Sequence, residues 1–544
     1  IIFSLENFTL HNHCKVFVIW ISLMFTSEVK SFFLSNCCAK AIKLSIRMHA
    51  SFSRPFFALN SFFKDKLFDN SIKTSFEVSS FLPVNSLVIS MEDTVHFKNY
   101  SKRKLLQEHL FELKDSNYQL FLSPIFNFSI GQDQTNLVDQ RLFRNTRGYY
   151  LAGNLLNKLS FVTTFYENQA CYSLYETAYF LEHGELYSTE SGIYQSQNAV
   201  IPGAARTKPF KENGFDFSYA TGQIIYQPFK NLTISAGNAP QFIGVGYRSL
   251  LLSDNSLPAP HVRLKCTIKS KWELNYMRMR LMNLVRKPVS SSVEAYYEPK
   301  AFSVNYYTYN FSPSFSLSFF EGLVWSMGDS IQTKGVHPLF YSPIPFLAEL
   351  TMNQQDLNSI IGLNVSYSGI KAQQFYGQIA SGNLKNAFAL QLGWRSYSCF
   401  GLKNSMLQFE YNQATEKMYQ SVNSRLSYSN GNLPLAHTMG TAFQELIFRF
   451  NIDFKRFYFD LKTTYYHLNN YTSISLLPIL KSKPLISTNL LFQAVELGYR
   501  FNKKTNFSTF IAWNYRSDQS NLLLPTNQFF LGLKTSLDNQ YTDF

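Results

Sequence analysis

The sequence predicts an all-β protein, namely a transmembrane antiparallel β-barrel of about 18 strands with a short helical segment at its N-terminus. The first observation behind this prediction is that apolar and polar residues alternate with period two along many short segments, which places them on opposite faces of a strand. The second is that short and long connections alternate along the chain, as in barrels whose turns and loops lie at opposite ends. The third is a composition that is rich in aromatic residues and poor in charge.

The stretch Glu445–His467 shows the alternation most clearly. In its first half, one face carries Leu446, Phe448, Phe450 and Ile452, and the other carries Glu445, Arg449, Asn451 and Asp453. After a tight connection near Asp453–Lys455, one face carries Phe457, Phe459, Leu461 and Tyr465, and the other carries Arg456, Asp460, Lys462 and Thr464. A soluble hairpin would bury the apolar face in a core, whereas a membrane barrel would turn it to lipid and enclose the polar face in a hydrated lumen.

From Phe121 onward, eighteen segments have strand character. They lie at 121–130, 147–154, 159–167, 217–226, 231–238, 262–269, 271–280, 300–309, 314–322, 360–367, 372–380, 387–395, 405–413, 443–452, 456–466, 491–500, 506–515 and 527–536. A ten-residue strand rises roughly 33 Å, and at a tilt near 40° it spans about 25 Å, the height of a membrane-facing apolar band. Lys271–Arg280 is irregular because its apolar face changes at Met277, which predicts a bulge or a misplaced boundary.

The connections separate into two kinds. Those after strands 2, 4, 6, 8, 10, 14 and 16 are short, and those after strands 1, 3, 5, 7, 9, 13, 15 and 17 are long. The longest are Asn168–Asp216 and Leu323–Ser359, and the rhythm departs only around strands 11–13. Short turns at one end and long loops at the other are typical of outer-membrane barrels, with the turns in the periplasm. A soluble sandwich gives no reason for this segregation, and no 40–50-residue repeat indicates a propeller.

The composition supports the same class. The 544 residues include 52 Phe and 33 Tyr, while charged residues make up only 16%, against roughly 25% in an ordinary soluble chain. The net charge of +14 favours anionic partners such as outer-membrane lipid, lipopolysaccharide phosphates or acidic polysaccharide. No nucleic-acid motif is recognisable, so no nucleic-acid partner is predicted. The six cysteines form no C-x-x-C pair and no zinc spacing, so we expect them to be unpaired.

The N-terminal region divides into a leader and a second segment. No transmembrane helix is expected, because the longest apolar run, Val16–Phe25, is shorter than the roughly 20 residues that a spanning helix needs. With Lys15 before it, this run has the size and flank of a signal-peptide core. We therefore assign residues 1–30 to a signal or leader, 31–114 to a partly helical periplasmic segment, and 115–544 to the outer-membrane barrel with long extracellular loops.

A short amphipathic helix is predicted at Ser101–Leu113. Leu106, Leu110 and Leu113 recur there at i, i+4 and i+7, the spacing of one helix face. We expect this helix to pack ahead of the strands.

Several motifs together resemble a known family. They are Phe242–Asp254, Leu142–Gly148, Phe165–Gln169, Pro202–Arg206 with Lys208–Phe210, and Pro434–His437 followed by Gly440 and Phe443–Glu445. In combination they resemble the Wzi-like capsule-assembly family, and within it the RemB-like gliding-motility branch of the Bacteroidetes. The resemblance implies an eighteen-stranded outer-membrane barrel with helical material at its N-terminus. It further implies lectin-like binding of exported polysaccharide at the cell surface, or a role in surface adhesion and motility.

The loop at Gly244–Asp254 allows two interpretations. In the first, Tyr247 stacks on a sugar ring while Arg248 and Asp254 bond hydroxyl or carboxylate groups of a ligand. In the second, the loop folds inward, Leu250–Leu252 pack in the barrel mouth, and Arg248 and Asp254 form an internal ion pair. The second is favoured slightly.

Five further residues are candidates for ligand binding in a loop or in the lumen. Arg144 and Arg147 have the charge to meet anionic glycan or lipopolysaccharide phosphate, although pairing inside the lumen is the commoner fate of such residues. Arg206 and Lys208 lie in the longest loop, where ligand contact and plain solvation are equally expected. His437 has no partner His or Cys nearby, so we expect it to form hydrogen bonds and not to bind a metal.

We therefore predict a monomeric barrel in the cell outer membrane that binds or organises surface polysaccharide, as in capsule or exopolysaccharide assembly, without turning it over. The motifs G-x-S-x-G and H-E-x-x-H and the P-loop are absent, so no enzyme activity, catalytic residue, metal or cofactor is predicted. One alternative is an accessory protein of gliding motility or surface adhesion, which would meet motility or export machinery. The other is a diffusion porin, since eighteen strands can leave an aqueous lumen.

Overall fold

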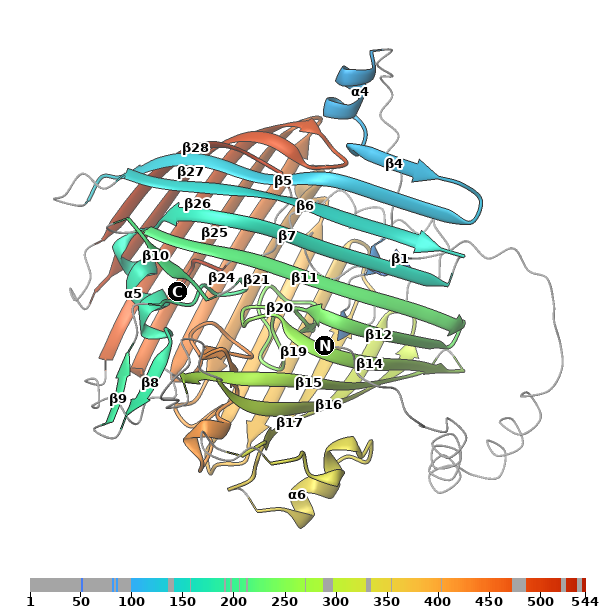
Figure 1. Ribbon diagram of the computed structural model, residues 1–544, viewed down its shortest axis with the longest axis vertical. Coiled ribbons are helices and arrows are strands. Elements are labelled where there is room, and N and C mark those ends of the chain that lie inside the picture. The colour runs from blue at the N-terminus through green and yellow to red at the C-terminus, as the bar shows by residue number, and fades with distance from the viewer. Residues whose placement is uncertain are drawn as a thin grey trace. The chain divides into compact units, whose positions relative to one another are not determined.

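Eighteen antiparallel strands close into a barrel in the computed structural model of the protein (Figure 1). The structure describes residues 50–51, 81–82, 85–86, 99–135, 141–156, 158–189, 192–195, 198–204, 206–211, 214–269, 271–286, 297–328, 334–353, 355–402, 404–471, 486–519, 525–535 and 541–544. All of them belong to the unit His49–Phe544.

The strands of the ring follow one another in chain order. They are β5 (Tyr118–Asp133), β6 (Arg141–Leu155), β7 (Leu159–Cys171), β11 (Gly214–Phe229), β12 (Leu232–Ala239), β14 (Ala259–Ile268), β15 (Trp272–Arg286), β16 (Tyr297–Ser312), β17 (Phe315–Ser326), β18 (Leu357–Tyr367), β19 (Gln373–Gly382), β20 (Phe388–Tyr397), β21 (Ser405–Ala414), β24 (Phe443–Phe454), β25 (Phe457–Tyr471), β26 (Ile486–Asn502), β27 (Phe507–Asp518) and β28 (Thr526–Lys534). The ring closes where β28 pairs with β5, with Leu531 opposite Ile130. Closure removes the exposed edges that an open sheet would present.

Each of the eighteen predicted strands corresponds to one strand of the ring, so the predicted fold class is confirmed. The observed strands are mostly longer at the end that carries the long loops. For example, β26 begins at Ile486 and β25 ends at Tyr471, five residues beyond the predicted limits in each case. Backbone pairing continues at that end after the alternation of apolar and polar residues has stopped. Strand lengths predicted from the alternation are therefore too short.

The predicted alternation of connections also holds. The short turns, which join β6 to β7, β11 to β12 and so on to β26 and β27, lie at one end of the barrel, called here the short-turn end. The opposite end is called the long-loop end. The irregularity around strands 11–13 has a simple cause: residues 383–387 form a short connection at the long-loop end, whereas 398–404 belong to the short-turn end.

The hairpin of β24 and β25 turns its apolar face outward, as the alternation predicts. Leu446 is 55% exposed, whereas its neighbour Glu445 is completely buried. Leu497 on β26 and Ile511 on β27 are likewise exposed on the outer wall. The outer surface here is therefore made of large apolar side chains.

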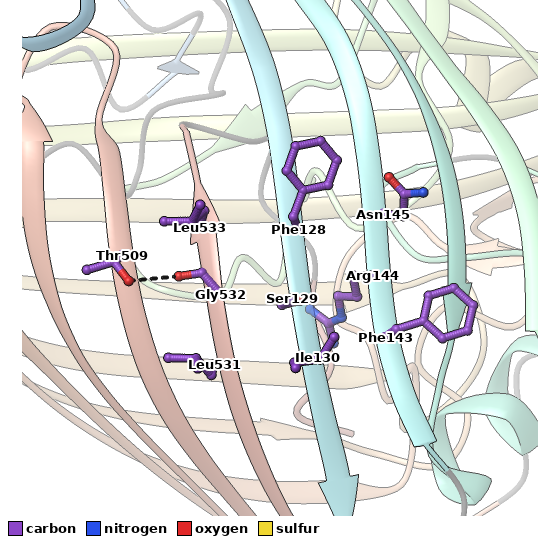
Figure 2. A pocket seen from close by; sticks show the side chains of 10 residues that line it. All are labelled: Phe128, Ser129, Ile130, Phe143, Arg144, Asn145, Thr509, Leu531, Gly532 and Leu533. Atoms are coloured by element: carbon purple, nitrogen blue, oxygen red, sulfur yellow. Dashed lines mark hydrogen bonds between the residues drawn. The ribbon is translucent and has the colours of Figure 1, made fainter.

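The seam between β28 and β5 carries a shallow apolar depression of about 640 Å³ on the outer wall (Figure 2). Its walls include Phe128, Ile130, Leu531 and Leu533, which are all exposed. Thr509 satisfies its hydroxyl locally by donating to the carbonyl of Gly532 at 3.2 Å (Figure 2). The depression continues the apolar outer surface across the seam.

The N-terminal helix is shorter than predicted. α4 spans Tyr100–Leu106, with Asn99 as its N-cap, so the predicted extension to Leu113 is wrong. The chain instead forms β4 (Phe111–Lys114), which pairs with residues 119–122 of β5. β28 pairs with β5 only from Asn127 onward, so β4 covers an edge of β5 that β28 leaves open. Sheet pairing has overridden the helical spacing of the leucines.

The remaining elements are short. The helices are α5 (Leu174–Glu182), α6 (Leu347–Thr351), η1 (Pro338–Tyr341), η2 (Cys399–Gly401) and η3 (Ser424–Leu426). The strands are β1 (Ala50–Ser51), β2 (Phe81–Leu82), β3 (Asn85–Ser86), β8 (Leu186–Thr189), β9 (Gly192–Gln195), β10 (Lys208–Phe210), β13 (Phe242–Ile243), β22 (Ser429–Asn430) and β23 (Leu433–Pro434). The two-residue strand β2 pairs with β13. The predicted leader, residues 1–30, lies outside the described residues.

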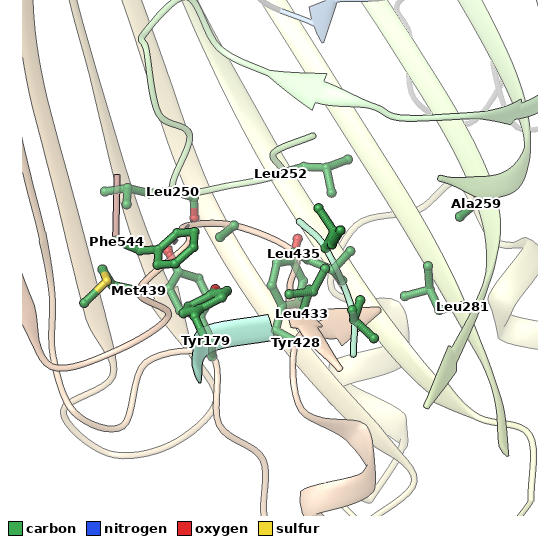
Figure 3. Packing of buried hydrophobic residues seen from close by; sticks show 14 of the residues in the cluster. Tyr179, Leu250, Leu252, Ala259, Leu281, Tyr428, Leu433, Leu435, Met439 and Phe544 are labelled. Atoms are coloured by element: carbon green, nitrogen blue, oxygen red, sulfur yellow. Dashed lines mark hydrogen bonds between the residues drawn. The ribbon is translucent and has the colours of Figure 1, made fainter. Parts of the chain in front are cut away.

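An apolar cluster inside the barrel corrects the expectation of a purely polar lumen. Residues of the loops fill it, among them Leu250, Leu252, Tyr428, Leu433 and Leu435 (Figure 3). Tyr179 of α5 stacks on Phe544 within the same cluster, with ring centroids 3.8 Å apart. Polar side chains are enclosed as predicted along β24 and β25, but the loops bring apolar ones to meet parts of the wall.

The irregular strand β15 contains no bulge at Met277. Its register with β16 is continuous from Trp272 to Asn283, so the predicted bulge is wrong at this position. Met277 and Met279 point inward and join the apolar interior cluster. The apolar face changes sides because the strand meets an apolar interior in this part of the wall.

Candidate functional site

The loop between β12 and β14, residues 240–258, folds into the barrel and is called here the inner loop. Every residue from Gln241 to Ser256 is buried. Gly244 adopts a φ of 117°, and a Cβ at this position would lie 2.3 Å from the side-chain nitrogen of Gln378 on β19. Glycine is therefore needed where the inner loop passes closest to the wall.

Several strand residues hold the backbone of the inner loop, among them Glu410 and Gln378. The carboxylate of Glu410 on β21 accepts from the backbone N–H of Tyr247 at 2.7 Å and from that of Arg248 at 2.9 Å. Gln378 accepts from the N–H of Leu250 at 2.8 Å. These wall side chains supply the partners that an irregular buried backbone requires.

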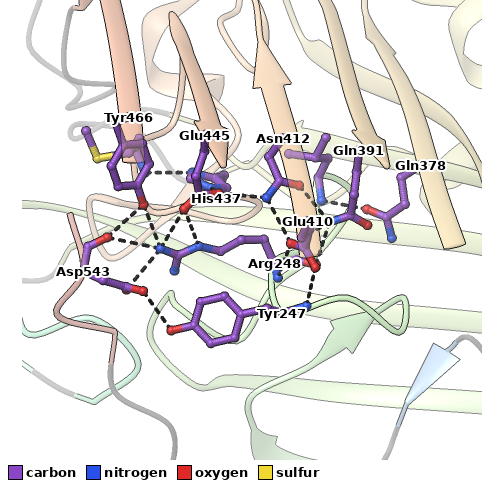
Figure 4. A network of polar contacts seen from close by, with 12 residues as sticks. Tyr247, Arg248, Gln378, Gln391, Glu410, Asn412, His437, Glu445, Tyr466 and Asp543 are labelled. Carbon is purple, nitrogen blue, oxygen red and sulfur yellow. Dashed lines mark hydrogen bonds and ion pairs between the residues drawn. The ribbon is translucent and has the colours of Figure 1, made fainter. Parts of the chain in front are cut away.

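Arg248 is the centre of a buried ionic network (Figure 4). Its guanidinium donates to Glu445 on β24 at 3.1 and 3.2 Å and to the hydroxyl of Tyr466 on β25 at 2.8 Å. It also lies 3.0 Å from a carboxylate oxygen of Asp543. Two carboxylates therefore surround one guanidinium, and they raise the pKa of Arg248 well above its usual value although burial opposes this.

Asp543 extends the same network to a second residue of β25. Its second carboxylate oxygen accepts from the hydroxyl of Tyr247 at 2.9 Å and from the ammonium of Lys462 at 3.0 Å. Although burial alone would raise the pKa of Asp543, the charges of Arg248 and Lys462 hold it below its usual value. The network thus joins the inner loop, β24, β25 and residues 541–544.

His437 completes the network as a hydrogen-bonding residue, as predicted. Its Nε2 lies 2.7 Å from the second oxygen of Glu445, and its ring stacks on Phe443. Burial lowers the pKa of His437, and Glu445 only partly opposes this effect. The imidazole therefore favours its neutral form, in which Nε2–H can donate to Glu445.

Asp254 does not pair with Arg248, so the predicted internal ion pair is wrong. Asp254 instead accepts from the hydroxyl of Tyr541 at 2.7 Å. The interpretation in which the loop folds inward is nevertheless the one that the structure shows, because Leu250, Leu251 and Leu252 are all buried in the interior cluster. Tyr247 and Arg248 are buried as well, so neither presents a face to a ligand.

The two arginines of β6 lie on opposite faces of the wall. Arg144 points inward, 3.4 Å from Glu176 of α5. Arg147 is exposed on the outer wall, directly opposite Glu167 of β7 in the strand register. The structure therefore brings Arg144 to α5, and it does not bring Arg144 and Arg147 together.

The long-loop end presents half-exposed cations above buried carboxylates. Arg206 donates to Glu185 at 3.2 Å and to the hydroxyl of Tyr297 at 2.8 Å, and its guanidinium lies over the Tyr297 ring. Arg425 of η3 pairs with Glu298, the next residue of β16, at 3.0 Å. More than a third of each of these two arginine side chains is exposed. We call Arg206, Tyr297 and Arg425 the mouth cluster.

Lys208 follows Arg206 by two residues. It is exposed on β10, opposite Asp216 of β11. Together with Lys211, which is exposed three residues further on, it adds positive charge at the long-loop end.

Several residues of these sites were not predicted from the sequence. Glu185, Glu410 and Asp543 lie far from their partners along the chain, and no motif marks them. The inward position of Glu410 in an alternating strand was a usable signal for a lumen carboxylate, whereas nothing near Asp543 indicated its role.

Neither a candidate metal site nor a membrane-spanning helix is found in the part of the chain that is described. No group of three or more His, Cys, Asp or Glu side chains among those residues could hold a metal ion. None of the described helices has the length and hydropathy to cross a membrane.

The fold and the site together define a class: a closed barrel of eighteen strands with an apolar outer wall and an interior filled by its own loops. No known protein family and no curated protein matches the sequence. The family resemblance seen in the motifs thus stays a prediction.

Solved structures with a similar barrel include two kinds of protein. One is Wzi, an outer membrane protein involved in group 1 capsule assembly in Escherichia coli and a carbohydrate-binding barrel; it is 14% identical, with a TM-score of 0.45, and the match covers 76% of this chain and 85% of that one. The others include OccAB4 of Acinetobacter baumannii (9% identity, TM-score 0.43, 78% and 98% covered) and OpdQ of Pseudomonas aeruginosa (10%, 0.40, 77% and 96%).

Proposed function

We propose that the protein is an outer-membrane barrel that binds acidic surface polysaccharide at its long-loop end and does not turn it over. The observation that carries the proposal is the filled interior. The inner loop is tied to the wall through the buried network of Arg248, and apolar side chains pack around it. A barrel filled in this way is suited to binding and not to diffusion.

Membrane insertion is supported by the outer wall. Its exposed side chains include Leu446, Leu497, Ile511 and Leu531, and exposed apolar surface of this extent is unfavourable in water. The antiparallel ring with turns at one end and long loops at the other is the arrangement of outer-membrane barrels. In that arrangement the long-loop end faces the exterior of the cell.

The choice of ligand rests on the mouth cluster. Arg206 and Arg425 present guanidinium groups that can donate paired hydrogen bonds to the carboxylate of an acidic sugar. The ring of Tyr297 lies beneath the guanidinium of Arg206, and its hydroxyl accepts a hydrogen bond from that group, so Tyr297 helps to hold Arg206 in position. Because Glu185 and Glu298 are buried below, they orient the arginines without covering them.

The first test measures retention of acidic polysaccharide on purified barrel. The double variant Arg206→Ala/Arg425→Ala should weaken binding at least about tenfold, which corresponds to about 1.4 kcal/mol. The matched control is Lys230→Ala/Lys271→Ala, which removes the same charge from exposed turns at the short-turn end and should bind as the parent does. Equal binding by both double variants, or no retention of any acidic polysaccharide, would contradict the proposal.

The second test is conductance in planar bilayers. We expect the parent barrel to show no stable large-conductance events, because the inner loop and its apolar contacts occupy the lumen. Stable large conductance by the parent would favour the diffusion porin over a binding barrel.

A further inference from the structure

The wall formed by β15, β16 and β17 has polar side chains on its outer face. The register places Tyr276, Asn305 and Glu321 side by side across the three strands. Their inward neighbours on these strands, Met277, Val304 and Phe320, all belong to the apolar interior cluster. The usual arrangement of a membrane barrel, with polar residues inside and apolar ones outside, is therefore inverted here.

A segment of the loop between β17 and β18 covers this polar patch. Residues 334–353, called here the strap, contain η1 and α6 and lie against the outer face of the wall, outside the ring of strands (Figure 1). The packing between strap and wall is apolar at one end. Phe340 and Ala348 of the strap are buried against Leu323, Trp325 and Leu357 of the wall.

The polar side chains of the wall bind the backbone of the strap. Tyr276 donates its hydroxyl to the carbonyl of Tyr341 at 3.0 Å, and Arg278 donates to the carbonyl of Ser342 at 2.8 Å. Tyr307 donates to the carbonyl of Pro343. An irregular backbone has no sheet partners of its own, so these bonds are what allows it to lie in a region without water.

Glu321 fixes the strap at its sharpest bend. The backbone of Phe346 is left-handed, with a φ of 63°, and its N–H donates to Glu321 at 2.5 Å. The other oxygen of Glu321 accepts from Asn305 at 2.7 Å. From Phe315 to Glu321 the strand climbs about 15 Å at a tilt near 40°, so this contact lies within an apolar band about 25 Å tall.

The outward side of the strap is apolar. Tyr341, Phe346 and Leu350 are 63%, 42% and 83% exposed. Between Pro338 and Met352 the sequence contains one charged residue, Glu349, and that residue is half-buried. The ring of Phe346 also touches Phe319 of the outer wall, with centroids 5.3 Å apart, so the strap surface is continuous with the apolar wall.

We propose that the strap is inserted into lipid, and that Tyr341, Phe346 and Leu350 contact acyl chains and the headgroup boundary of the leaflet nearer the long-loop end. A lipid occupant follows from two observations: from Pro338 onward the exposed side chains of the strap carry no charge, Lys334 lying at its start, and they continue the apolar outer wall. Aromatic residues are also the side chains favoured at this boundary. The proposal rests on membrane insertion of the barrel, as proposed above.

Quenching by brominated acyl chains tests the proposal in the full-length barrel. Tryptophan is introduced by Leu350→Trp in the strap, by Leu497→Trp in the wall and by Val422→Trp in the loop of residues 415–442, where Val422 is 49% exposed. Each is compared with the parent, whose five tryptophans set the background. We expect the brominated acyl chains to quench the fluorescence of the tryptophans introduced at positions 350 and 497. The fluorescence of the tryptophan at position 422 should be unaffected.

The outcomes separate the two proposals. Quenching at 497 without quenching at 350 overturns the lipid-inserted strap and leaves membrane insertion of the barrel intact. Absence of quenching at both positions overturns membrane insertion itself. Covalent dimers formed through Leu350→Cys, in place of quenching at 350, would assign the surface to a second copy of the chain and overturn the proposal as well.

The anchor of the strap is tested separately by hydrogen exchange. Glu321→Leu removes the acceptor of the Phe346 N–H, whereas Glu321→Gln keeps an oxygen there. We expect the amides of residues 334–353 to exchange at least about tenfold faster in Glu321→Leu than in Glu321→Gln. Equal exchange in the two variants would show that Glu321 does not hold the strap.

Discussion

At the residue scale, Arg248 joins three parts of the chain that lie far apart in sequence: the inner loop, the hairpin of β24 and β25, and residues 541–544. Its partner Glu445 is 197 residues away, and Asp543 is further still. A buried guanidinium between two carboxylates is favourable only while every partner is present, because each charge has lost its water. The main effect of the network is therefore to fix the inner loop in one position, and its net contribution to stability is smaller.

The first prediction concerns this network. Arg248→Ala leaves Glu445 and Asp543 without their shared cation, and breaking a buried pair in this way costs about 3–5 kcal/mol. We expect a lower free energy of unfolding in detergent and the appearance of channel conductance, since the inner loop is released. The control Arg141→Ala removes an exposed arginine and should change stability by less than about 0.5 kcal/mol. A closed and equally stable Arg248→Ala barrel would show that apolar packing alone holds the loop.

The second prediction concerns the pH dependence of stability. Because burial lowers the pKa of His437 in the folded protein, the unfolded chain, with a histidine pKa of about 6.5, takes up the proton first. The contribution of His437 is therefore complete above about pH 6.5 and is lost as the pH falls toward the folded pKa.

The measurement compares unfolding of the parent and His437→Gln between pH 7.5 and roughly 4.5, a range chosen around the unfolded pKa. Gln keeps a donor for Glu445 but does not titrate, so its stability should fall less steeply with acid. The comparison between variants is needed because burial also lowers the pKa of His109, to about 4. Identical slopes would exclude a contribution from His437.

At the element scale, the alternation within a strand reports what lies on each side of it. In β24 and β25 it indicates an apolar outer face and polar groups inside, and the structure agrees. In β15 the same alternation is inverted from Tyr276 onward, because apolar loop residues lie inside this half of the strand and the strap covers its outside. The apolar face of β15 does change sides at Met277, as the sequence indicates. The cause is the apolar loop residues on the inside and the strap on the outside, and not a bulge.

The third prediction tests the lipid face of a single strand. Leu497→Arg places a charge on the exposed apolar wall of β26, which in the middle of a bilayer costs about 2–4 kcal/mol. Gln493→Arg changes a residue on the same face of the same strand, where a polar side chain already stands, and is the matched control. We expect Leu497→Arg to reduce folding into vesicles, measured by the gel shift between folded and unfolded barrel, and Gln493→Arg to reduce it much less. Equal folding of the two variants would contradict a lipid-facing wall at Leu497.

At the scale of the whole molecule, the barrel depends on one pairing between its first and last ring strands. That pairing brings together residues about 400 positions apart, such as Ile130 and Leu531. All other neighbours in the ring are consecutive strands joined by a connection. Because the chain between them is so long, the pairing of β5 with β28 costs more chain entropy than any other pairing in the ring. The backbone hydrogen bonds that it forms along both edges offset this cost.

The fourth prediction tests closure directly. Ile130→Cys/Leu531→Cys places two thiols opposite each other across the seam, within the distance that a disulfide spans. Oxidation should give a chain that migrates differently after heat denaturation until it is reduced. In the control Ile130→Cys/Ile511→Cys, the second thiol lies one strand further away on the same face, so we expect no crosslink. A crosslink in the control, or none in the seam pair, would contradict the closed register.

The sequence by itself determined the number of ring strands, their order, the segregation of turns from loops and the outward direction of Leu446 and its apolar neighbours. These properties are local, since period-two alternation and connection length can be seen in a few consecutive residues. Only the tertiary structure decided that the lumen is filled, that Arg248 pairs with Glu445 and Asp543 and not with Asp254, and that the strap covers β15 to β17. Such contacts join residues that lie between 25 and 295 positions apart. The sequence around a charged residue or a leucine in a loop does not indicate which partner it will contact.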